Sequence, residues 1–165
     1  MRNHSRKLKL SLAALGVFAV GGIAGGVAIS AVKDDPPAPK YNSLARTVNP
    51  IGAKGRALGL SRVVIQPGAK IPLHYHEGTQ VSYIQDGTLT YTVAQGGVKV
   101  MDGPGDDGEV VRRIKAGDTG KIREGQWIVE QPTTIHRAAN NGDDKIVIYL
   151  SNLLDKDAAP STLVP

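Results

Sequence analysis

The chain has 165 residues, enough for one globular domain of ordinary size plus an appended segment. Its formal net charge of +5 comes from the N-terminus. Of the 20 basic residues, four lie in residues 1–32, which contain no acidic residue, so the other 16 nearly balance the 15 acidic ones. A domain this close to neutral lacks the basic surface of a nucleic-acid-binding protein. The absence of cysteine excludes disulfides, thiolate metal sites and a cysteine nucleophile.

An uncharged apolar stretch, LSLAALGVFAVGGIAGGVAISAV, fills residues 10–32 after a basic tail at residues 1–9. As an α-helix it would be roughly 34 Å long, enough to cross a hydrocarbon core of about 30 Å. The basic residues before it favour an N-terminal transmembrane helix that leaves the rest of the chain extracytoplasmic. The alternative is a signal peptide cleaved near Ala31, which would give a secreted domain. The anchor is favoured because the stretch exceeds the roughly 7–15 apolar residues of an ordinary signal peptide.

The segment after the apolar stretch is rich in proline and charge. It begins with KDDPPAPK, and we expect residues 33–47 to be an extended linker between the membrane and a folded domain at residues 48–165. Residues 41–56 have no clear periodicity. They are left unassigned, although they could add an edge strand.

Short stretches with a period of two follow, separated by glycine, proline, asparagine and aspartate. They predict strands at residues 57–66, 71–76, 79–85, 88–93, 98–101, 110–114, 126–131, 135–139 and 145–151. Without a long amphipathic helical segment among them, they indicate an all-β domain, either an antiparallel sandwich or a barrel. The acidic segment 102–109 is expected to be an exposed loop rather than a calcium site, because it lacks the EF-hand spacing. Residues 153–165 are expected to be a loosely ordered tail.

Two histidines, His74 and His76, stand two residues apart in a predicted strand. Residues i and i+2 of a strand share one face, so both imidazoles can reach one metal ion while Tyr75 points away. A third histidine, His136, closes a second segment that reads as strand, proline turn, strand. Only His4, in the N-terminal tail, lies outside these two segments.

The first segment resembles the first sequence motif of the cupin superfamily, G-x5-H-x-H-x3-4-E-x6-G. The motif matches at Gly68, His74, His76 and Gly87. The position of its acidic residue is occupied by Gln80, which departs from the family pattern.

The second segment resembles the second cupin motif, G-x5-P-x-G-x2-H-x3-N. Gly125, His136 and Asn140 match in register. The proline is displaced by one position to Pro132, and Thr133 takes the place of the inner glycine. Histidines spaced in two separate motifs make the resemblance more specific for fold than for function.

The resemblance implies an antiparallel jelly-roll β-barrel that holds a divalent metal ion, Fe, Mn, Ni, Cu or Zn, with His74, His76, Gln80 and His136 as its ligands. The alternative is a barrel that has lost its metal and keeps a polar pocket. An amide, unlike a carboxylate, cancels none of the charge of a metal ion, so Gln80 would leave the ion more electrophilic.

In several cupin dioxygenases, too, three histidines are the protein ligands of the metal ion. The leading hypothesis is therefore a metal-dependent dioxygenase that acts on a small chelating organic molecule at Fe(II) or a similar metal. The second hypothesis is a membrane-tethered module that binds a small ligand or a metal without catalysis. Glu130 is the only obvious candidate for a general acid or base in the domain, and its side chain could face the interior or the solvent. A Ser-His-Asp hydrolase is not supported, because the chain has no G-x-S-x-G segment.

Two further expectations concern partners and packing. Glycines four residues apart, Gly21 and Gly25, Gly22 and Gly26, would let two anchors pair as a homodimer, and cupin domains often pair through their own sheets. The alternative is that these glycines occur without pairing. The aromatic residues Trp127, Tyr83 and Tyr91 are expected to pack in the core rather than to bind a ligand.

Overall fold

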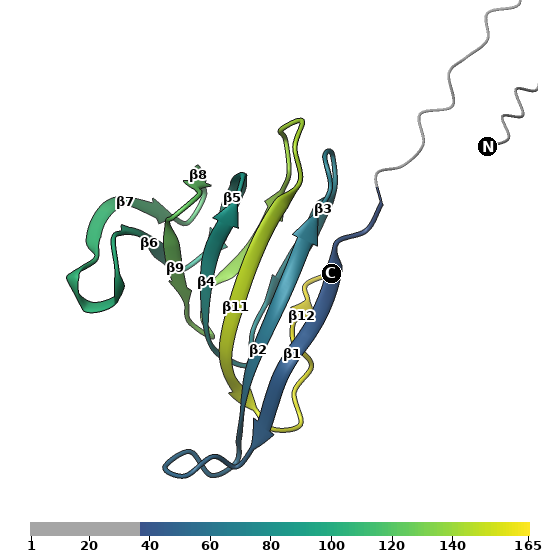
Figure 1. Cartoon of the computed structure of the whole chain (residues 1–165), viewed down its shortest axis with the longest axis vertical. Helices are drawn as coiled ribbons and strands as arrows, with labels where there is room; N and C mark the ends of the chain where they lie inside the picture. The colour runs from purple at the N-terminus through teal and green to yellow at the C-terminus, as the bar shows by residue number, and fades with distance from the viewer. Residues whose placement is uncertain (1–36) are drawn as a thin grey trace, which may run out of the picture. The chain divides into compact units, whose positions relative to one another are not determined.

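The computed structural model describes residues 37–165 (Figure 1). The basic tail and the expected transmembrane segment, residues 10–32, lie outside the described residues. Within residues 37–165, no helix has the length and the apolar character needed to span a bilayer.

The described residues form twelve strands and one short 3₁₀ helix. In chain order these are β1 (Lys40–Val48), β2 (Arg56–Ile65), β3 (Lys70–Tyr75), β4 (Gly78–Asp86), β5 (Thr88–Gln95), β6 (Gly97–Asp102), η1 (Gly105–Asp107), β7 (Glu109–Lys115), β8 (Thr119–Arg123), β9 (Trp127–Glu130), β10 (Ile135–Ala139), β11 (Ile146–Asp155) and β12 (Thr162–Leu163). The helix η1 lies in the acidic segment 102–109, most of which is exposed.

The strands form two sheets, and neighbouring strands are antiparallel throughout (Figure 1). Seven strands make one sheet in the order β1-β2-β11-β4-β9-β6-β7, and five make the other in the order β12-β3-β10-β5-β8. Sheet neighbours come from distant parts of the sequence, since β11 lies between β2 and β4. This double sheet confirms the predicted all-β antiparallel class.

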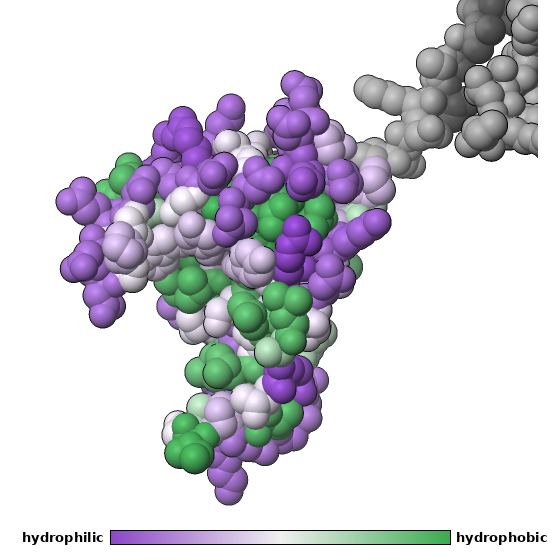
Figure 2. Space-filling view, viewed as in Figure 1, coloured by the Kyte–Doolittle hydropathy of each residue, from purple (hydrophilic) through white to green (hydrophobic). Residues whose placement is uncertain are grey.

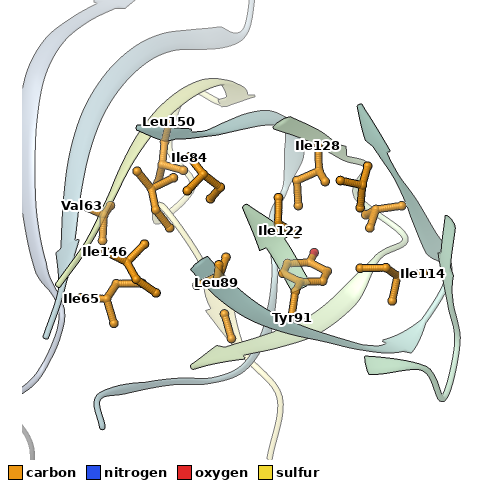
Figure 3. Packing of buried hydrophobic residues seen from close by; sticks show 14 of the residues in the cluster. Val63, Ile65, Ile84, Leu89, Tyr91, Ile114, Ile122, Ile128, Ile146 and Leu150 are labelled. Atoms are coloured by element: carbon orange, nitrogen blue, oxygen red, sulfur yellow. The ribbon is translucent and has the colours of Figure 1, made fainter. Parts of the chain in front are cut away.

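The apolar core lies between the two sheets, where alternate residues of the strands turn inward (Figure 3). Along β4 the alternation is strict: Ile84 is fully buried, whereas Tyr83 is 39% exposed. Ile65 from the larger sheet and Ile122 from the smaller one are also fully buried. Inward-facing isoleucine and valine from both sheets therefore hold the layers together.

Four strands differ from the sequence-based expectation or go beyond it. Strand β1 begins at Lys40, inside the range 33–47 expected to be linker, and is the edge strand that residues 41–56 had left open. Strand β8 was not expected at all. The expected loose tail at residues 153–165 is wrong, because β11 continues to Asp155 and β12 pairs Thr162 and Leu163 with β3.

Apolar residues also gather on the outward face of the larger sheet. Leu58 and Leu153 stand opposite each other on β2 and β11, and Leu60 and Val81 extend the patch. Figure 2 shows apolar surface, edged by polar side chains, over the part of the face where β2 and β11 lie. Tyr83 is on this outward face, so the expectation that it packs in the core is wrong.

Candidate metal centre

His74 lies near the end of β3 and His76 directly after it. Both side chains are buried, at 4% and 3% exposure, whereas Tyr75 between them is half-buried. The turn before β3 depends on Gly68, whose φ of 77° favours glycine. The N–H of Gly68 donates to the carbonyl of Asn140, 2.9 Å away, so this turn ties the first motif to the second.

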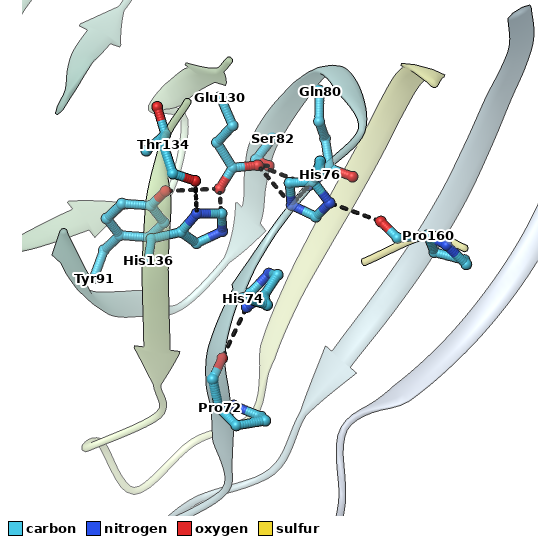
Figure 4. A network of polar contacts seen from close by, with 10 residues as sticks. All are labelled: Pro72, His74, His76, Gln80, Ser82, Tyr91, Glu130, Thr134, His136 and Pro160. Carbon is cyan, nitrogen blue, oxygen red and sulfur yellow. Dashed lines mark hydrogen bonds and ion pairs between the residues drawn. The ribbon is translucent and has the colours of Figure 1, made fainter. Parts of the chain in front are cut away.

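His136 reaches the same place from β10, which pairs with β3 so that His136 stands opposite His74. The ring centroids of these two residues are 4.2 Å apart. The ring of His76 lies 5.0 Å from His74 and 5.3 Å from His136. The nitrogen atoms that could bind a metal all lie within 4.8 Å of one another. The structure therefore brings together the three histidines that the motifs single out (Figure 4).

The Nδ1 atom of each ring is hydrogen-bonded to a backbone carbonyl. The acceptors are the carbonyl oxygens of Pro72 for His74, at 2.8 Å, of Pro160 for His76, at 2.7 Å, and of Thr134 for His136, at 3.2 Å. A carbonyl can only accept, so each Nδ1 carries the proton and donates it. In a neutral ring this leaves the lone pair on Nε2. The three rings are thus oriented as metal ligands usually are, with a backbone acceptor behind each one.

The environment also favours neutral histidines. Burial, together with the neighbouring His136, lowers the pKa of His74 to about 4. Burial likewise lowers the pKa of His76, although Glu130 opposes this shift. A neutral imidazole is the form that binds a metal, so at neutral pH His74 and His76 need not lose a proton to do so.

Glu130, at the end of β9, places a carboxylate beside these rings and is only 3% exposed (Figure 4). Three neutral groups donate hydrogen bonds to it. The hydroxyl of Tyr91 donates to Oε1 at 2.9 Å, and the amide of Gln80 and the hydroxyl of Ser82 donate to Oε2 at 2.7 Å and 3.0 Å. The side chain whose direction was open from sequence therefore faces inward.

The same carboxylate faces two imidazoles. Its Oε1 lies 3.1 Å from Nε2 of His136, and its Oε2 lies 3.7 Å from Nε2 of His76. Burial by itself would raise the pKa of Glu130. The close approach of His136, together with His76 and Gln80, outweighs burial and lowers that pKa to about 2. Glu130 is therefore a buried negative charge.

Gln80 stands directly opposite Glu130 in the pairing of β4 with β9 and is 4% exposed. Its amide nitrogen donates to the carboxylate and lies 3.1 Å from Nε2 of His76. The atom that Gln80 presents to these groups is thus its nitrogen, whereas a metal ligand would use its oxygen. Gln80 lies beside His76 and Glu130, and its role as a metal ligand stays a prediction.

Two adjoining pockets reach the site. The inner one is lined by the polar side chains of the site and by apolar side chains from both sheets. The outer one lies between β1, β2, β11 and the segment around Ala158 and Pro160, and it reaches His76. Gln80 and Leu150 line both pockets. A small molecule in the outer pocket would therefore meet the site at His76 and Gln80.

The donors fit a divalent transition metal. Three imidazoles turn their Nε2 atoms toward one place, with a carboxylate beside them. Imidazole suits Fe, Ni, Cu and Zn, and carboxylate oxygen also suits Mn. Small ring rotations would close the 4.8 Å spacing to the roughly 4 Å or less that metal–nitrogen bonds of about 2.0–2.1 Å require. The buried cluster of His74, His76 and His136 is therefore consistent with a divalent metal site.

A double antiparallel sheet that turns histidines from two separate motifs into its interior is the arrangement of the cupins. The family profile described as Cupin matches residues 31–161, and the chain belongs to the cupin family. The resemblance inferred from the two motifs is thereby confirmed. No curated protein matches the chain.

Solved structures are similar to the chain in fold. The polyketide cyclase RemF from Streptomyces resistomycificus is 12% identical, with a TM-score of 0.51 over 79% of this chain and 75% of that one. The DMSP lyase DddQ from Ruegeria pomeroyi is 16% identical, with a TM-score of 0.51 over 84% of this chain. The match spans 57% of that lyase. A cupin superfamily protein from Desulfitobacterium hafniense is 14% identical, with a TM-score of 0.46 over 71% of this chain and 78% of that one.

Two contributors to the site were missed from sequence, and a third, Glu130, was named as a possible acid or base without a direction. Glu130 shares its strand face with Ile128, two residues earlier, so recognising Ile128 as core would have pointed Glu130 inward. Tyr91 is buried as expected, but its hydroxyl binds the carboxylate and its ring stacks on His136 at 4.9 Å. No sequence signal placed the carbonyl of Pro160 beside His76, because backbone groups carry no residue signature.

Proposed function

We propose that this protein is an extracytoplasmic, metal-dependent cupin dioxygenase that acts on a small chelating organic molecule. The observation that carries the proposal is the convergence of three buried imidazoles, each backed by a carbonyl, where two adjoining pockets reach the site. A metal ion bound there, Fe(II) or a similar one, would act as a Lewis acid with coordination positions left for substrate and dioxygen.

The residues around the donors support a small organic substrate. The inner pocket has a volume of about 30 Å³, which leaves room for an ion and little more. The outer pocket, about 260 Å³, has both apolar and polar side chains in its lining, with Leu150, Ser43 and Asn152 among them. A small molecule whose body lies in the outer pocket and whose chelating end reaches the site fits this combination.

Glu130 changes one part of the reasoning from sequence. Gln80 was expected to leave the ion more electrophilic than an acidic ligand would. A carboxylate nevertheless lies 2.7 Å from the Gln80 amide, so the site carries a negative charge after all. The proposal therefore depends on the three imidazoles and the pocket, and not on the neutrality of Gln80.

The test measures dioxygen consumption by the full chain in detergent. Protein loaded with one Fe(II) per chain would be mixed with a catechol, a β-diketone or a flavonol in an oxygen electrode, with His136→Ala as the control. We expect one of these classes to give consumption well above the control. Full iron occupancy without consumption for any class would contradict a dioxygenase.

A non-catalytic binding module is the second candidate, and one observation favours it. Glu130, the one carboxylate at the site, already receives hydrogen bonds from three neutral donors. A carboxylate held so firmly is a poor base, because proton uptake would sacrifice those bonds. Stoichiometric metal together with no turnover would favour this candidate.

The proposed location follows from the sequence alone, because residues 10–32 lie outside the described residues. An uncleaved apolar stretch of this length would anchor the chain and place the cupin domain outside the cytoplasm. Protease added to intact cells should then remove the domain. A domain that is cut only after lysis would contradict this orientation.

A further inference from the structure

The carboxylate of this site, Glu130, lies on β9, whereas the acidic position of the family motif lies on the neighbouring strand β4. In the motif that position falls on Gln80, which is an amide. Across the β4–β9 pair, the residue in register with Gln80 is Glu130, and both side chains are buried. Cβ atoms of directly opposed residues lie about 4.5–5.5 Å apart, so the two positions can reach the same point in the interior.

The contact of the carboxylate with His136 needs a positive charge between the two groups. Nδ1 of His136 donates to Thr134, so Nε2 of the neutral ring holds a lone pair, and this atom faces Oε1 of Glu130 at 3.1 Å. Two lone pairs at such a distance repel unless a cation lies between them, either a proton or a metal ion. Nε2 of His76 lies further off, 3.7 Å from Oε2, and the Gln80 amide nitrogen is within hydrogen-bond distance of both atoms. The carboxylate and the imidazole of His136 are therefore directed at one shared cation, with the other two imidazoles beside them.

Gln80 is oriented to hold the carboxylate rather than to replace it. One amide N–H donates to Oε2 of Glu130 at 2.7 Å, and the nitrogen also lies 3.1 Å from Nε2 of His76. Rotating the amide to offer its oxygen to a metal would set that oxygen against a carboxylate oxygen. The same rotation would remove the shortest hydrogen bond that Glu130 receives from a neutral group.

We propose that Glu130 is the anionic ligand of the metal centre and that Gln80 positions it, so that acid and amide have exchanged places across the β4–β9 pair. The inference rests on the proposed metal site. It assigns Glu130 a role that the motif does not, and it makes Gln80 a positioning residue. The donor set is then three imidazoles and one carboxylate.

The experiment measures Zn(II) binding to the full chain by elemental analysis and by competition with a chelator of known affinity. Glu130→Gln removes the charge and nearly keeps the shape. It should weaken Zn(II) binding by at least about 100-fold, which is more than the loss of a group that only hydrogen-bonds to a ligand would cost. The double variant Gln80→Glu plus Glu130→Gln returns one acid and one amide to the pair with their places reversed. It should bind Zn(II) within about tenfold of the parent.

Matched controls make the same chemical changes on the solvent side. Gln85→Glu on β4 and Glu124→Gln before β9 involve exposed residues, and both should leave the affinity unchanged. Co(II) substitution adds a spectroscopic readout. The visible spectrum of the Glu130→Gln variant should differ from that of the parent if the carboxylate binds the metal, and the spectrum of the double variant should return toward it.

Three results would contradict three different parts of the proposal. Affinity of Glu130→Gln within about threefold of the parent overturns the assignment of Glu130 as a ligand. A double variant that binds no more tightly than Glu130→Gln overturns the exchange between the two strands. A parent that takes up no stoichiometric metal overturns the proposed metal centre itself, and this inference with it.

Discussion

The same strands build two layers of the interior, and the two layers differ in composition. On β4, Gln80 is buried and polar, and Ile84, four residues further on, is fully buried and apolar. On β9 the apolar Ile128 precedes the charged Glu130, and on β10 the polar layer contains His136. Figures 3 and 4 show the two layers separately. In both layers every second residue of a strand is buried, so burial alone does not distinguish the apolar core from the candidate metal site.

The difference lies in what each layer contributes. The apolar layer stabilises the fold through area removed from water. In the polar layer, every buried side-chain nitrogen and oxygen of the described residues has a hydrogen-bond partner. Yet a buried charge with its partners is weak evidence for stability, because desolvation offsets much of the gain. The polar layer is therefore best explained by a function, and substitutions in the two layers should have opposite signatures.

The largest effect is expected from removing one imidazole. His74→Ala, His76→Ala and His136→Ala should each abolish stoichiometric metal, because a site with three imidazoles loses affinity out of proportion when one is removed. Elemental analysis gives the metal content, and circular dichroism should show the parent's β structure. His74→Ala is the cleanest of the three, because His76 and His136 lie 3.7 Å and 3.1 Å from the Glu130 carboxylate, so their removal would also disturb Glu130.

The control for this prediction is Arg137→Ala, an exposed neighbour on β10 that should change neither metal content nor fold. Metal binding by His136→Ala as tight as the parent's would mean that the two motif segments do not form one site.

The opposite signature is expected from Ile84→Ala in the apolar layer. Ile84 is fully buried between the sheets, and its truncation should cost about 2–5 kcal/mol of unfolding free energy. Urea denaturation measures the loss, and the folded fraction should keep its full metal content. Val81→Ala on the outward face of the same strand should cost less than about 1 kcal/mol. Equal losses for the two variants would contradict the assignment of the inward face.

The apolar layer was largely predictable from sequence, and the polar layer only in part. Most strands follow from period-two patterns, since inward residues such as Ile84 and Ile128 are apolar. Strand β8, with the sequence TGKIR, was missed because its inward residues are Gly120 and Ile122, so only one large apolar side chain marks it. The histidines were found because their chemistry and spacing are unusual.

The partners of the histidines could not be found in this way. The period of two in β9 can point Glu130 inward, but only the register of β4 against β9 brings its carboxylate to Gln80, and no local pattern specifies that register. The C-terminal segment was expected to be a tail because its sequence, KDAAPSTLVP, has almost no periodicity. Its order comes instead from pairing with β3 and from the carbonyl of Pro160.

That segment provides a test of how the polar layer is supported. A chain that lacks residues 156–165 loses the acceptor of His76 Nδ1 and the pairing of β12 with β3. Its metal affinity should fall by about 10–100-fold, the usual cost of removing the group behind a ligand. The apolar core lies entirely before these residues, so the protein should remain folded.

A second truncation separates the two contributions of the segment. A chain that ends at Ser161 keeps the carbonyl of Pro160 but lacks β12. Its affinity should lie closer to that of the parent. If both truncated proteins bind metal as tightly as the full chain, the segment does not support the site.

The smallest effect is expected from Tyr91→Phe, because Tyr91 belongs to both layers. Its ring is part of the apolar cluster, and its hydroxyl donates to Glu130 at 2.9 Å. The substitution keeps the ring and removes one donor from a buried carboxylate, which should cost about 1–3 kcal/mol in the metal-free protein. Chemical denaturation measures it. Tyr149→Phe, at a half-buried outward position on β11, is the matched control and should cost less.

The pH dependence of this deficit tests whether the hydroxyl acts through the carboxylate. The pKa of Glu130 in the folded protein is lowered from 4.5 to about 2. A lowered pKa contributes stability that is fully present above the unfolded value and is lost as the pH falls through the folded one. Loss of the Tyr91 donor would raise the folded pKa toward 4.5 and remove part of that contribution. The deficit of Tyr91→Phe should therefore be largest near neutral pH and shrink as the pH falls from 4.5 toward 2. A deficit that does not change over this range would mean that the hydroxyl stabilises the fold without acting on Glu130.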